Sequence, residues 1–229
     1  MNIGIVFAMQ EELDAFRKYF DEIETIQEGR ITIYHVKNDR NQLYFLKCGV
    51  GKVNAAYATT KLLNYVKLDM LFNSGVAGGI DVEHGALVLG EYIVHHDFDV
   101  TAFSDYVRGQ IPSLPLRFLG DKVLIDKAKS FLDTKAYVLA TIASGDQFVV
   151  SQESLRAILK LYPSIKAIEM EAAAIAQVAT LENIPFLVIR AISDVIGEPS
   201  QSENFERFLE EASKRSAALL YELVCVSWN

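Results

Sequence analysis

Four charged residues lie in the part of the sequence that composition marks as most deeply buried. Glu169 and Glu171 interrupt an apolar run, and Arg190 and Asp194 belong to the apolar segment that follows it. Burying a charge costs several kcal/mol unless it is paired or has a chemical role. Carboxylates in apolar surroundings can serve as general acids and bases near neutral pH. Two interpretations remain open: an acid–base site, or an Arg190–glutamate ion pair with Asp194 capping the next turn.

The elements expected around these residues bring them to one edge of a sheet. The small residues of Ala172–Ala179 predict a packed helix whose positive N-terminal end lies near Glu171. Phe186–Ile192 is typical of a strand buried on both faces, and Ser193 and Asp194 follow where it ends. In open α/β sheets, ligands bind beyond the carboxyl ends of the strands. We therefore expect Glu171, Arg190 and Asp194 at one rim.

Another acidic residue follows the first expected strand. Ile3–Ala8 predicts a buried strand, and a helical apolar spacing begins at Leu13, so Glu11 and Glu12 lie at a strand-to-helix junction. Such a pair is commonly explained by the helix dipole. Its position nevertheless assigns Glu12 to the same rim as Asp194.

Two further strands are expected to end in glycine-containing segments. Asp69–Asn73 leads into Ser74–Gly79, and Tyr137–Ala143 leads into Ser144–Val149, with Ser151 as the cap of the helix after it. Glycines at a strand end permit close approach of a ligand to the backbone, although for Ser74–Gly79 taken alone a sharp turn is the favoured interpretation.

Two motifs argue against other chemistry. Gly49–Lys52 lacks the Ser or Thr that follows the lysine of a phosphate-binding loop, because Val53 stands there, so a tight strand-to-helix turn is expected. His95 and His96 would point to opposite faces of a strand, although Asp97 and Asp99 follow. We expect neither a metal nor another cofactor.

Composition limits the class of protein. The chain has 229 residues, 51% of them hydrophobic and 23% charged, which suits one α/β domain over residues 1–229. Its net charge of −8 disfavours nucleic acid as a partner. No apolar run reaches the roughly 18 residues of a membrane span. Cys48 and Cys225 lack a CxxC pattern, so we expect buried thiols in a reducing, cytoplasmic setting.

The rest of the chain supplies the frame. Ile31–Val36 and Leu43–Cys48 flank a polar turn at 38–41 and predict a hairpin. Val100–Pro115 is a long irregular stretch with apolar side chains, which indicates a functional or interface segment. A long amphipathic helix is expected from Glu203 to the end, with Phe205 at its start. Seven or more strands alternate with about five helices, mostly in βαβ order.

Six segments in chain order carry a family resemblance: GIVFAMQEE at 4–12, SGVAGG at 74–79, DVTAF at 99–103, SGDQF at 144–148, IEMEAAAIA at 168–176 and RAISD at 190–194. They resemble the 5′-methylthioadenosine/S-adenosylhomocysteine nucleosidases of the purine nucleoside phosphorylase superfamily. The resemblance covers almost the whole chain. It implies a single-domain, three-layer α/β fold with a central mixed, partly barrel-like sheet flanked by helices.

The resemblance also implies a reaction, the hydrolysis of the N9–C1′ bond of an adenine thionucleoside to adenine and a 5-thioribose. Glu12 would activate water and Asp194 would protonate purine N7. Glu171 and Met170 would hold the ribose, and Arg190 would steady this cluster. Phe148 would stack on adenine, and the backbone of Val149 would contact the edge of the base. Met9, Val50 and Phe205 would line the sugar and alkylthio pocket. The other substrate-binding residues that the resemblance implies are Val76, Ala77, Gly78, Glu169 and Ser193.

By the same resemblance the protein is a homodimer, in which Val100, Phe103 and Pro112 complete the neighbour's site. Val76 stands where serine is frequent, Gln10 replaces a frequent acidic residue, and Gly197–Ser202 is unusual in length and sequence. These departures leave open which 5′ substituent is preferred.

Other functions stay open at this point. They are a hydrolase of 6-amino-6-deoxyfutalosine or 5′-deoxyadenosine, a phosphorylase of the same fold, and a non-catalytic nucleoside-binding relative. A phosphorylase would need arginine near the glycine segment, and SGVAGG has none beside it.

Overall fold

The computed structural model describes residues 1–38, 40–103, 105–134, 136–226 and 228. Asp39 of the predicted turn, Ser104 of the predicted loop, and Ser227 and Asn229 of the predicted C-terminal helix lie outside the described residues. The strands are β1 (Asn2–Phe7), β2 (Glu24–Glu28), β3 (Ile31–Lys37), β4 (Gln42–Lys47), β5 (Met70–Gly79), β6 (Leu87–His95), β7 (Phe118–Leu119), β8 (Tyr137–Ser144), β9 (Ile165–Glu169) and β10 (Phe186–Val195). The helices are α1 (Gln10–Arg17), α2 (Lys52–Tyr65), α3 (Lys122–Lys129), α4 (Gln152–Leu161), α5 (Ala172–Leu181) and α6 (Gln201–Cys225).

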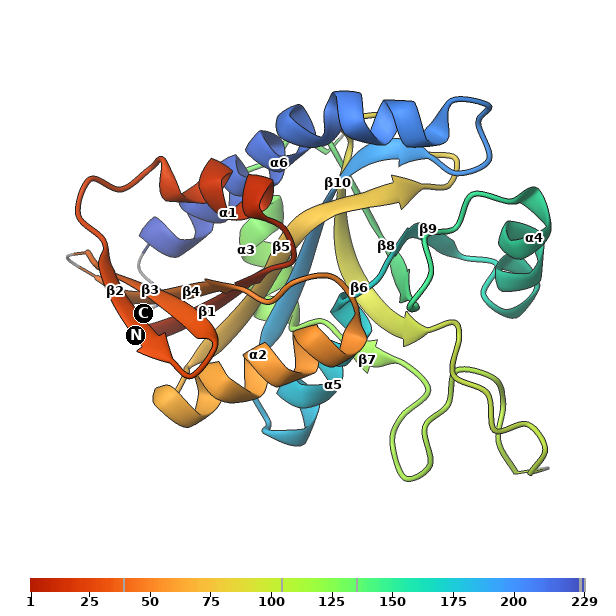
Figure 1. Ribbon diagram of the computed structural model, residues 1–229, viewed down its shortest axis with the longest axis horizontal. Helices are drawn as coiled ribbons and strands as arrows, with labels where there is room; N and C mark the ends of the chain where they lie inside the picture. The colour runs from red at the N-terminus through yellow and green to blue at the C-terminus, as the bar shows by residue number, and fades with distance from the viewer. Residues whose placement is uncertain (39, 104, 135, 227, 229) are drawn as a thin grey trace.

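The sheet is mixed and closes on itself at one end. Its order is β10-β6-β8-β9-β5-β1-β4-β3-β2, and β10 also pairs with β5, so β5, β10, β6, β8 and β9 form a closed ring. β5 pairs in parallel with both β1 and β10 and is therefore shared by the ring and the open part of the sheet (Figure 1). The expected mixed, partly barrel-like sheet is confirmed.

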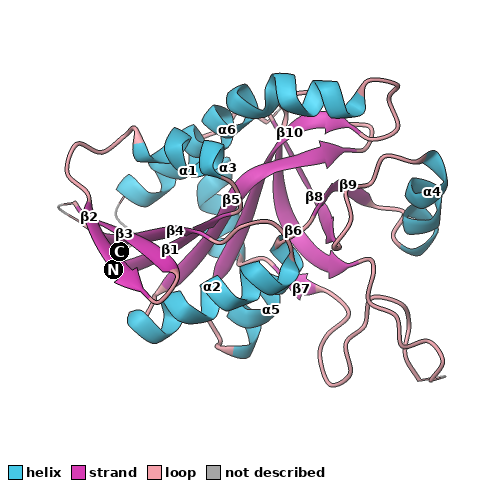
Figure 2. Ribbon diagram, viewed as in Figure 1, coloured by secondary structure: helices cyan, strands magenta, loops and turns pink. Residues whose placement is uncertain are grey.

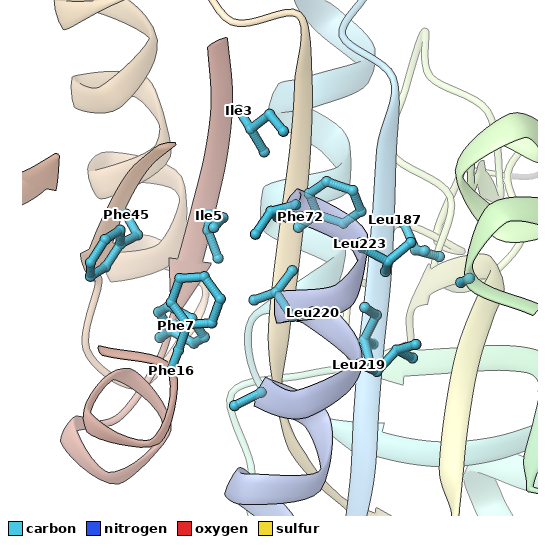
Figure 3. Packing of buried hydrophobic residues seen from close by; sticks show 14 of the residues in the cluster. Ile3, Ile5, Phe7, Phe16, Phe45, Phe72, Leu187, Leu219, Leu220 and Leu223 are labelled. Atoms are coloured by element: carbon cyan, nitrogen blue, oxygen red, sulfur yellow. The ribbon is translucent and has the colours of Figure 1, made fainter. Parts of the chain in front are cut away.

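Helices cover both faces of the sheet, which gives the expected three layers (Figure 2). On one side α1, α3 and α6 pack in an apolar cluster against β1, β5 and β10. On the other side α2 and α5 pack in a second cluster. Figure 3 shows the first cluster, in which residues from β1, β5 and β10 meet α6: Ile3, Ile5, Phe7, Phe72, Leu187, Leu219, Leu220 and Leu223.

Most of the expected elements are confirmed, and their differences have physical reasons. The hairpin is formed by β3 and β4, and the Gly49–Lys52 segment is a tight turn in which Gly49 and Gly51 have φ of 87° and 97°. Strand β2 was not expected, because its sequence ETIQE lies mostly exposed at the sheet edge without an apolar pattern. Cys48 and Cys225 are free thiols of intermediate exposure rather than fully buried ones.

Candidate active site

A cavity of about 400 Å³ lies where β1, β5, β9 and β10 meet the first turns of α1 and α6. This volume is in the range of small-molecule sites in proteins. Thirteen of the predicted site residues line it: Met9, Glu12, Val50, Val76, Ala77, Gly78, Phe148, Glu169, Met170, Glu171, Ser193, Asp194 and Phe205. Four other residues line the cavity without having been predicted as site residues: Ala8, Ile168, Ser202 and Glu206.

Glu12 lines this cavity, and backbone amides hold its carboxylate in place. Its Oε2 accepts hydrogen bonds from the amides of Ala8 (2.8 Å) and Met9 (3.0 Å), and its Oε1 accepts one from the amide of Val76 (3.0 Å). Burial raises the pKa of Glu12, and the charge of Arg190 and the three amides offset this rise only in part. A buried carboxylate with a raised pKa is equipped to accept a proton near neutral pH. Its neighbour Glu11 is exposed.

The glycine segment has a different role from the one expected. Ser74–Gly79 is neither a loop nor a sharp turn, because β5 runs without a break to Gly79. A Cβ atom at Gly75 would collide with the Glu12 carboxylate, and one at Gly78 would lie 2.8 Å from Cγ1 of Ile196 and 3.1 Å from Oδ2 of Asp194. These two glycines therefore make room for the carboxylates of the site.

Glu169 links the start of α5 to Ser144 and Arg190. Its Oε2 accepts hydrogen bonds from the amides of Glu171 (3.1 Å) and Ala172 (2.8 Å) at the start of α5, and Ser144 Oγ donates to its Oε1. Arg190 Nη2 lies 2.6 Å from the same Oε2. The structural interpretation, an ion pair between Arg190 and a glutamate, is thus correct for this pair.

Arg190 is almost fully buried, at 2% exposure, and it does not reach the cavity surface formed by the described residues. Its guanidinium also donates to the Ile189 carbonyl (2.9 Å) and to the side chain of Asn73. Among the residues predicted to bind substrate, Arg190 therefore lies behind Glu169 rather than in the cavity wall.

The side chain of Glu171 lines the cavity, whereas that of Glu169 accepts the hydrogen bonds from the first amides of α5. Its backbone is the N-cap of α5, but its Oε1 accepts a hydrogen bond from the Gly51 amide (2.7 Å). Burial and the neighbouring Glu169 raise the pKa of Glu171 to about 8. The Gly49–Lys52 turn thus directs an amide at a carboxylate of the site. Sequence reasoning missed this contact because the two residues lie 120 positions apart.

Asp194 reaches the cavity because of an irregularity in β10. The register between β10 and β5 shifts between Ile192 and Asp194, and such a bulge re-aims the side chain that follows it. Ile192 packs in the apolar core, whereas Asp194 lines the cavity. Its Oδ1 accepts from Ser193 Oγ (2.7 Å) and its Oδ2 from Gln201 Nε2 (2.8 Å), in place of the turn-capping role considered above.

Burial raises the pKa of Asp194, while the hydrogen bonds from Ser193 and Gln201 lower it by less. A raised pKa favours the protonated form, which can donate a proton to a ligand. Gln201 was not expected to take part, since it lies in a polar segment with no distinguishing pattern.

Aromatic side chains form the outer wall. Phe148 and Phe205 meet edge to face with ring centroids 5.6 Å apart, and Phe148 is 45% exposed. Val149 is buried and its carbonyl accepts a hydrogen bond from Gln201, but its side chain lies outside the main cavity. An exposed aromatic face at a cavity mouth can stack on a planar base.

The titratable side chains that line the cavity are acidic. The described residues that line it include no lysine, arginine or histidine, and the acidic ones are Glu12, Glu169, Glu171, Asp194 and Glu206. Phosphate sites are typically built from arginine, lysine and backbone amides. This lining is therefore unfavourable for an anionic co-substrate.

The histidine pair lies away from the cavity lining. His95 and His96 are both buried, burial lowers the pKa of each, and Asp97 is paired with Lys52. No group of three or more His, Cys, Asp or Glu side chains in the described part of the chain is arranged to hold a metal ion. Across the described ranges, no helix combines the length and apolar character that crossing a bilayer requires.

The segment predicted to reach a neighbouring subunit lies apart from the cavity. Val100 is partly exposed, Pro112 is exposed, and Phe103 is 67% exposed. None of these three residues is in the cavity wall.

Comparisons with known proteins agree with this geometry. The family model described as "Phosphorylase superfamily" matches residues 2–224. The chain is 39% identical over 228 residues to the 5′-methylthioadenosine/S-adenosylhomocysteine nucleosidase of Desulfotalea psychrophila, covering 98% of this chain and 97% of the relative. It is 40% identical to the nucleosidase of the same name from Geobacillus thermodenitrificans, covering 99% and 97%.

A solved structure is similar throughout. The nucleosidase from Neisseria meningitidis, in complex with methylthio-immucillin-A, matches with a TM-score of 0.92 and 37% identity over 97% of this chain and 98% of that one. The sheet closure and the site thus define a member of the phosphorylase superfamily. Within it, the chain belongs to the family of 5′-methylthioadenosine/S-adenosylhomocysteine nucleosidases.

Proposed function

We propose that this chain hydrolyses the N-glycosidic bond of 5′-methylthioadenosine and S-adenosylhomocysteine, releasing adenine and the corresponding 5-thioribose. The names of its relatives support the substrates. The observation that carries the proposal is one acidic cavity, without a cation among its described lining residues, that contains both Glu12 and Asp194.

Glu12 acts as the general base. Three amides hold its carboxylate, so its position in the cavity is set before substrate arrives. It accepts a proton from water as the water oxygen forms a bond to C1′. The N9–C1′ bond breaks, and its electron pair goes to the purine.

Asp194 acts as the general acid. Adenine leaves poorly as an anion, so protonation at N7 lowers the barrier to cleavage. Burial favours the protonated form of Asp194 that this step requires. Adenine gains one proton from Asp194, and Glu12 gains one proton from the water. Proton exchange with solvent then returns Glu12 to its ionised form and Asp194 to its protonated form.

The remaining residues bind and orient the substrate. Phe148 stacks on adenine and the backbone of Val149 contacts its edge, while Glu171 and Met170 bind the ribose hydroxyls. Glu169 and Arg190 hold Glu171 and the start of α5 in position. The residues assigned to the sugar and the alkylthio group, or to the walls around them, are Met9, Val50, Val76, Ala77, Gly78, Ser193 and Phe205.

The acidic lining supports water rather than phosphate as the nucleophile. A phosphate dianion would meet no cation among the described lining residues, and the ionised carboxylate of Glu12 that serves as the base would repel it in a poorly solvated space. Water carries no such penalty.

We also infer that the protein is a cytoplasmic homodimer in which Val100, Phe103 and Pro112 approach the neighbour's cavity. Support comes from exposed apolar side chains on α2 and on this loop: Val53 (78%), Tyr57 (47%), Phe103 (67%) and Val107 (53%). Light scattering of the purified protein tests this, and a monomeric mass at micromolar concentration would contradict it.

Adenine release from methylthioadenosine, measured with and without phosphate, tests the function. We expect release in the absence of phosphate, with free methylthioribose as the second product. Glu12→Gln should lower kcat by about 10²–10⁴-fold, whereas Glu11→Gln, on the exposed side of the same helix, should leave it unchanged. A strict requirement for phosphate, or no release from the wild-type chain, would refute the proposal.

A further inference from the structure

Gln201 is buried between exposed neighbours. It begins α6 and is 4% exposed, although Glu198, Ser200 and Ser202 around it are exposed. Its side chain therefore turns inward from a surface segment. Burying a carboxamide is unfavourable unless its polar atoms are paired, and here they all have partners.

The side-chain nitrogen of Gln201 donates to Asp194 and to the Val149 carbonyl, the two residues proposed to contact the edge of adenine. Nε2 of Gln201 donates to Oδ2 of Asp194 at 2.8 Å and to the carbonyl of Val149 at 2.9 Å. The Oε1 atom accepts a hydrogen bond from the Gly197 amide at 2.9 Å. The carboxamide thus links the proton donor to the backbone proposed to contact adenine.

A carboxamide NH₂ and the 6-amino group of adenine present the same donors. Each is a planar nitrogen with two N–H bonds, and neither nitrogen is a useful acceptor. A base stacked on Phe148 with N7 near Asp194 directs its 6-amino group toward the same edge of the site. The two nitrogens therefore compete for one pair of acceptors.

The space beside Gln201 is too small for a base while this side chain stays in place. A hollow of about 30 Å³ lies between Gln201, Phe148, Val149 and Asp194. Such a volume holds about one water molecule, not a purine ring. The main cavity shares Phe148 and Asp194 with this hollow, so removing the carboxamide would extend the cavity toward Val149.

We propose that Gln201 closes the base subsite of the empty enzyme, with its carboxamide nitrogen in the place of the adenine 6-amino group, so that an entering adenine must displace it. This inference depends on the proposed function, because it takes adenine as the base that enters. Gln201 is then an internal competitor of substrate and product. A subsite that is closed for about nine-tenths of the time weakens apparent affinity about tenfold.

Titration calorimetry of the full chain with adenine tests the proposal. We expect Gln201→Ala to bind adenine about three- to tenfold more tightly than the wild type. Gln201→Met keeps most of the volume but donates no hydrogen bond, so it should also bind more tightly, and it carries the test if the alanine variant fails to fold. Gln152→Ala is the matched control, because Gln152 contacts the Gly197 carbonyl (3.4 Å) of the same turn. Its affinity should be unchanged.

Unchanged or weaker adenine binding in both Gln201 variants would overturn the proposal. A lower kcat with unchanged adenine affinity would show instead that Gln201 positions Asp194 during catalysis. If wild-type protein binds adenine but releases none from methylthioadenosine, the proposed function fails while the affinity comparison still decides the role of Gln201. Absence of adenine binding in every variant would overturn the role proposed for Gln201, while adenine release from methylthioadenosine would still decide the proposed function.

Discussion

The carboxylate of Glu12 occupies the space that a side chain at position 75 would need. A Cβ atom built on Gly75 would collide with Oε1 of Glu12, and the backbone amide of the next residue, Val76, donates a hydrogen bond to that same oxygen. The position of Glu12, the proposed general base, is therefore set by the absence of a side chain at Gly75 on β5. A glycine inside a buried strand commonly marks such a close approach.

Gly75→Ala should displace Glu12 and lower kcat by about 100-fold, the effect expected when a catalytic group is misplaced by about 1 Å. Steady-state kinetics of adenine release measures this loss. In a Glu12→Ala background the collision is gone, so adding Gly75→Ala should cost little further stability in urea unfolding. Equal destabilisation in both backgrounds would contradict the assignment.

Asp194→Asn should lower kcat by at least ~10²-fold with little change in KM, because the amide retains the shape of the carboxyl group but is not an effective acid. Glu203→Gln, an exposed acidic residue in the first turn of α6, is the control and should behave as wild type. Near-wild-type turnover of Asp194→Asn would remove Asp194 from the mechanism.

Glu171→Gln should change how stability depends on pH. The folded pKa of Glu171 is about 8, above its ordinary value of 4.5, so between these values the folded state holds the proton more firmly. The free energy of unfolding therefore falls as pH rises from about 4.5 to about 8. Urea unfolding at pH 5 and pH 8 should show a smaller fall for Glu171→Gln than for wild type. Glu182→Gln, at the exposed end of α5, is the control and should show the same fall in unfolding free energy between pH 5 and pH 8 as the wild type. A wild-type fall in Glu171→Gln would show that the pKa of Glu171 is not raised in the folded state.

Arg190→Met should destabilise the fold by about 3–5 kcal/mol, because it leaves the buried Glu169 carboxylate without its ionic partner. Adding Glu169→Gln to this variant should recover part of the loss, as the unpaired charge is removed. Strict additivity of the two substitutions in denaturant unfolding would argue against coupling between them.

The buried charges could be located from the sequence because their chemistry conflicts with their surroundings. Glu12 and Glu171 come shortly after the apolar strands β1 and β9, and Asp194 lies at the carboxyl end of β10. Strand ends of this kind meet at one edge of a sheet. The same rule could not separate the roles of Glu169 and Glu171. That division depends on which carboxylate reaches the first amides of α5, a matter of a few ångströms.

Other parts of the site give no local sequence signal. The bulge that aims Asp194 into the cavity arises from pairing between β10 and β5. The glycine segment remains a strand because β10 pairs along it and β9 pairs with Gly78 and Gly79, and this pairing overrides the weak strand propensity of glycine. Gln201 has significance only through contacts with Asp194 and Val149 that form in the folded chain.

The closed ring of strands also determines when the site can form as the chain folds. β5 and β10 must pair before Asn73 meets Arg190, a residue 117 positions away, and before Asp194 comes to lie opposite Gly78. Long-range pairing of this kind is slow, because loop closure must occur before the contacts stabilise the chain. During refolding from denaturant, helix formation should therefore precede the return of turnover, which appears only with closure of the ring.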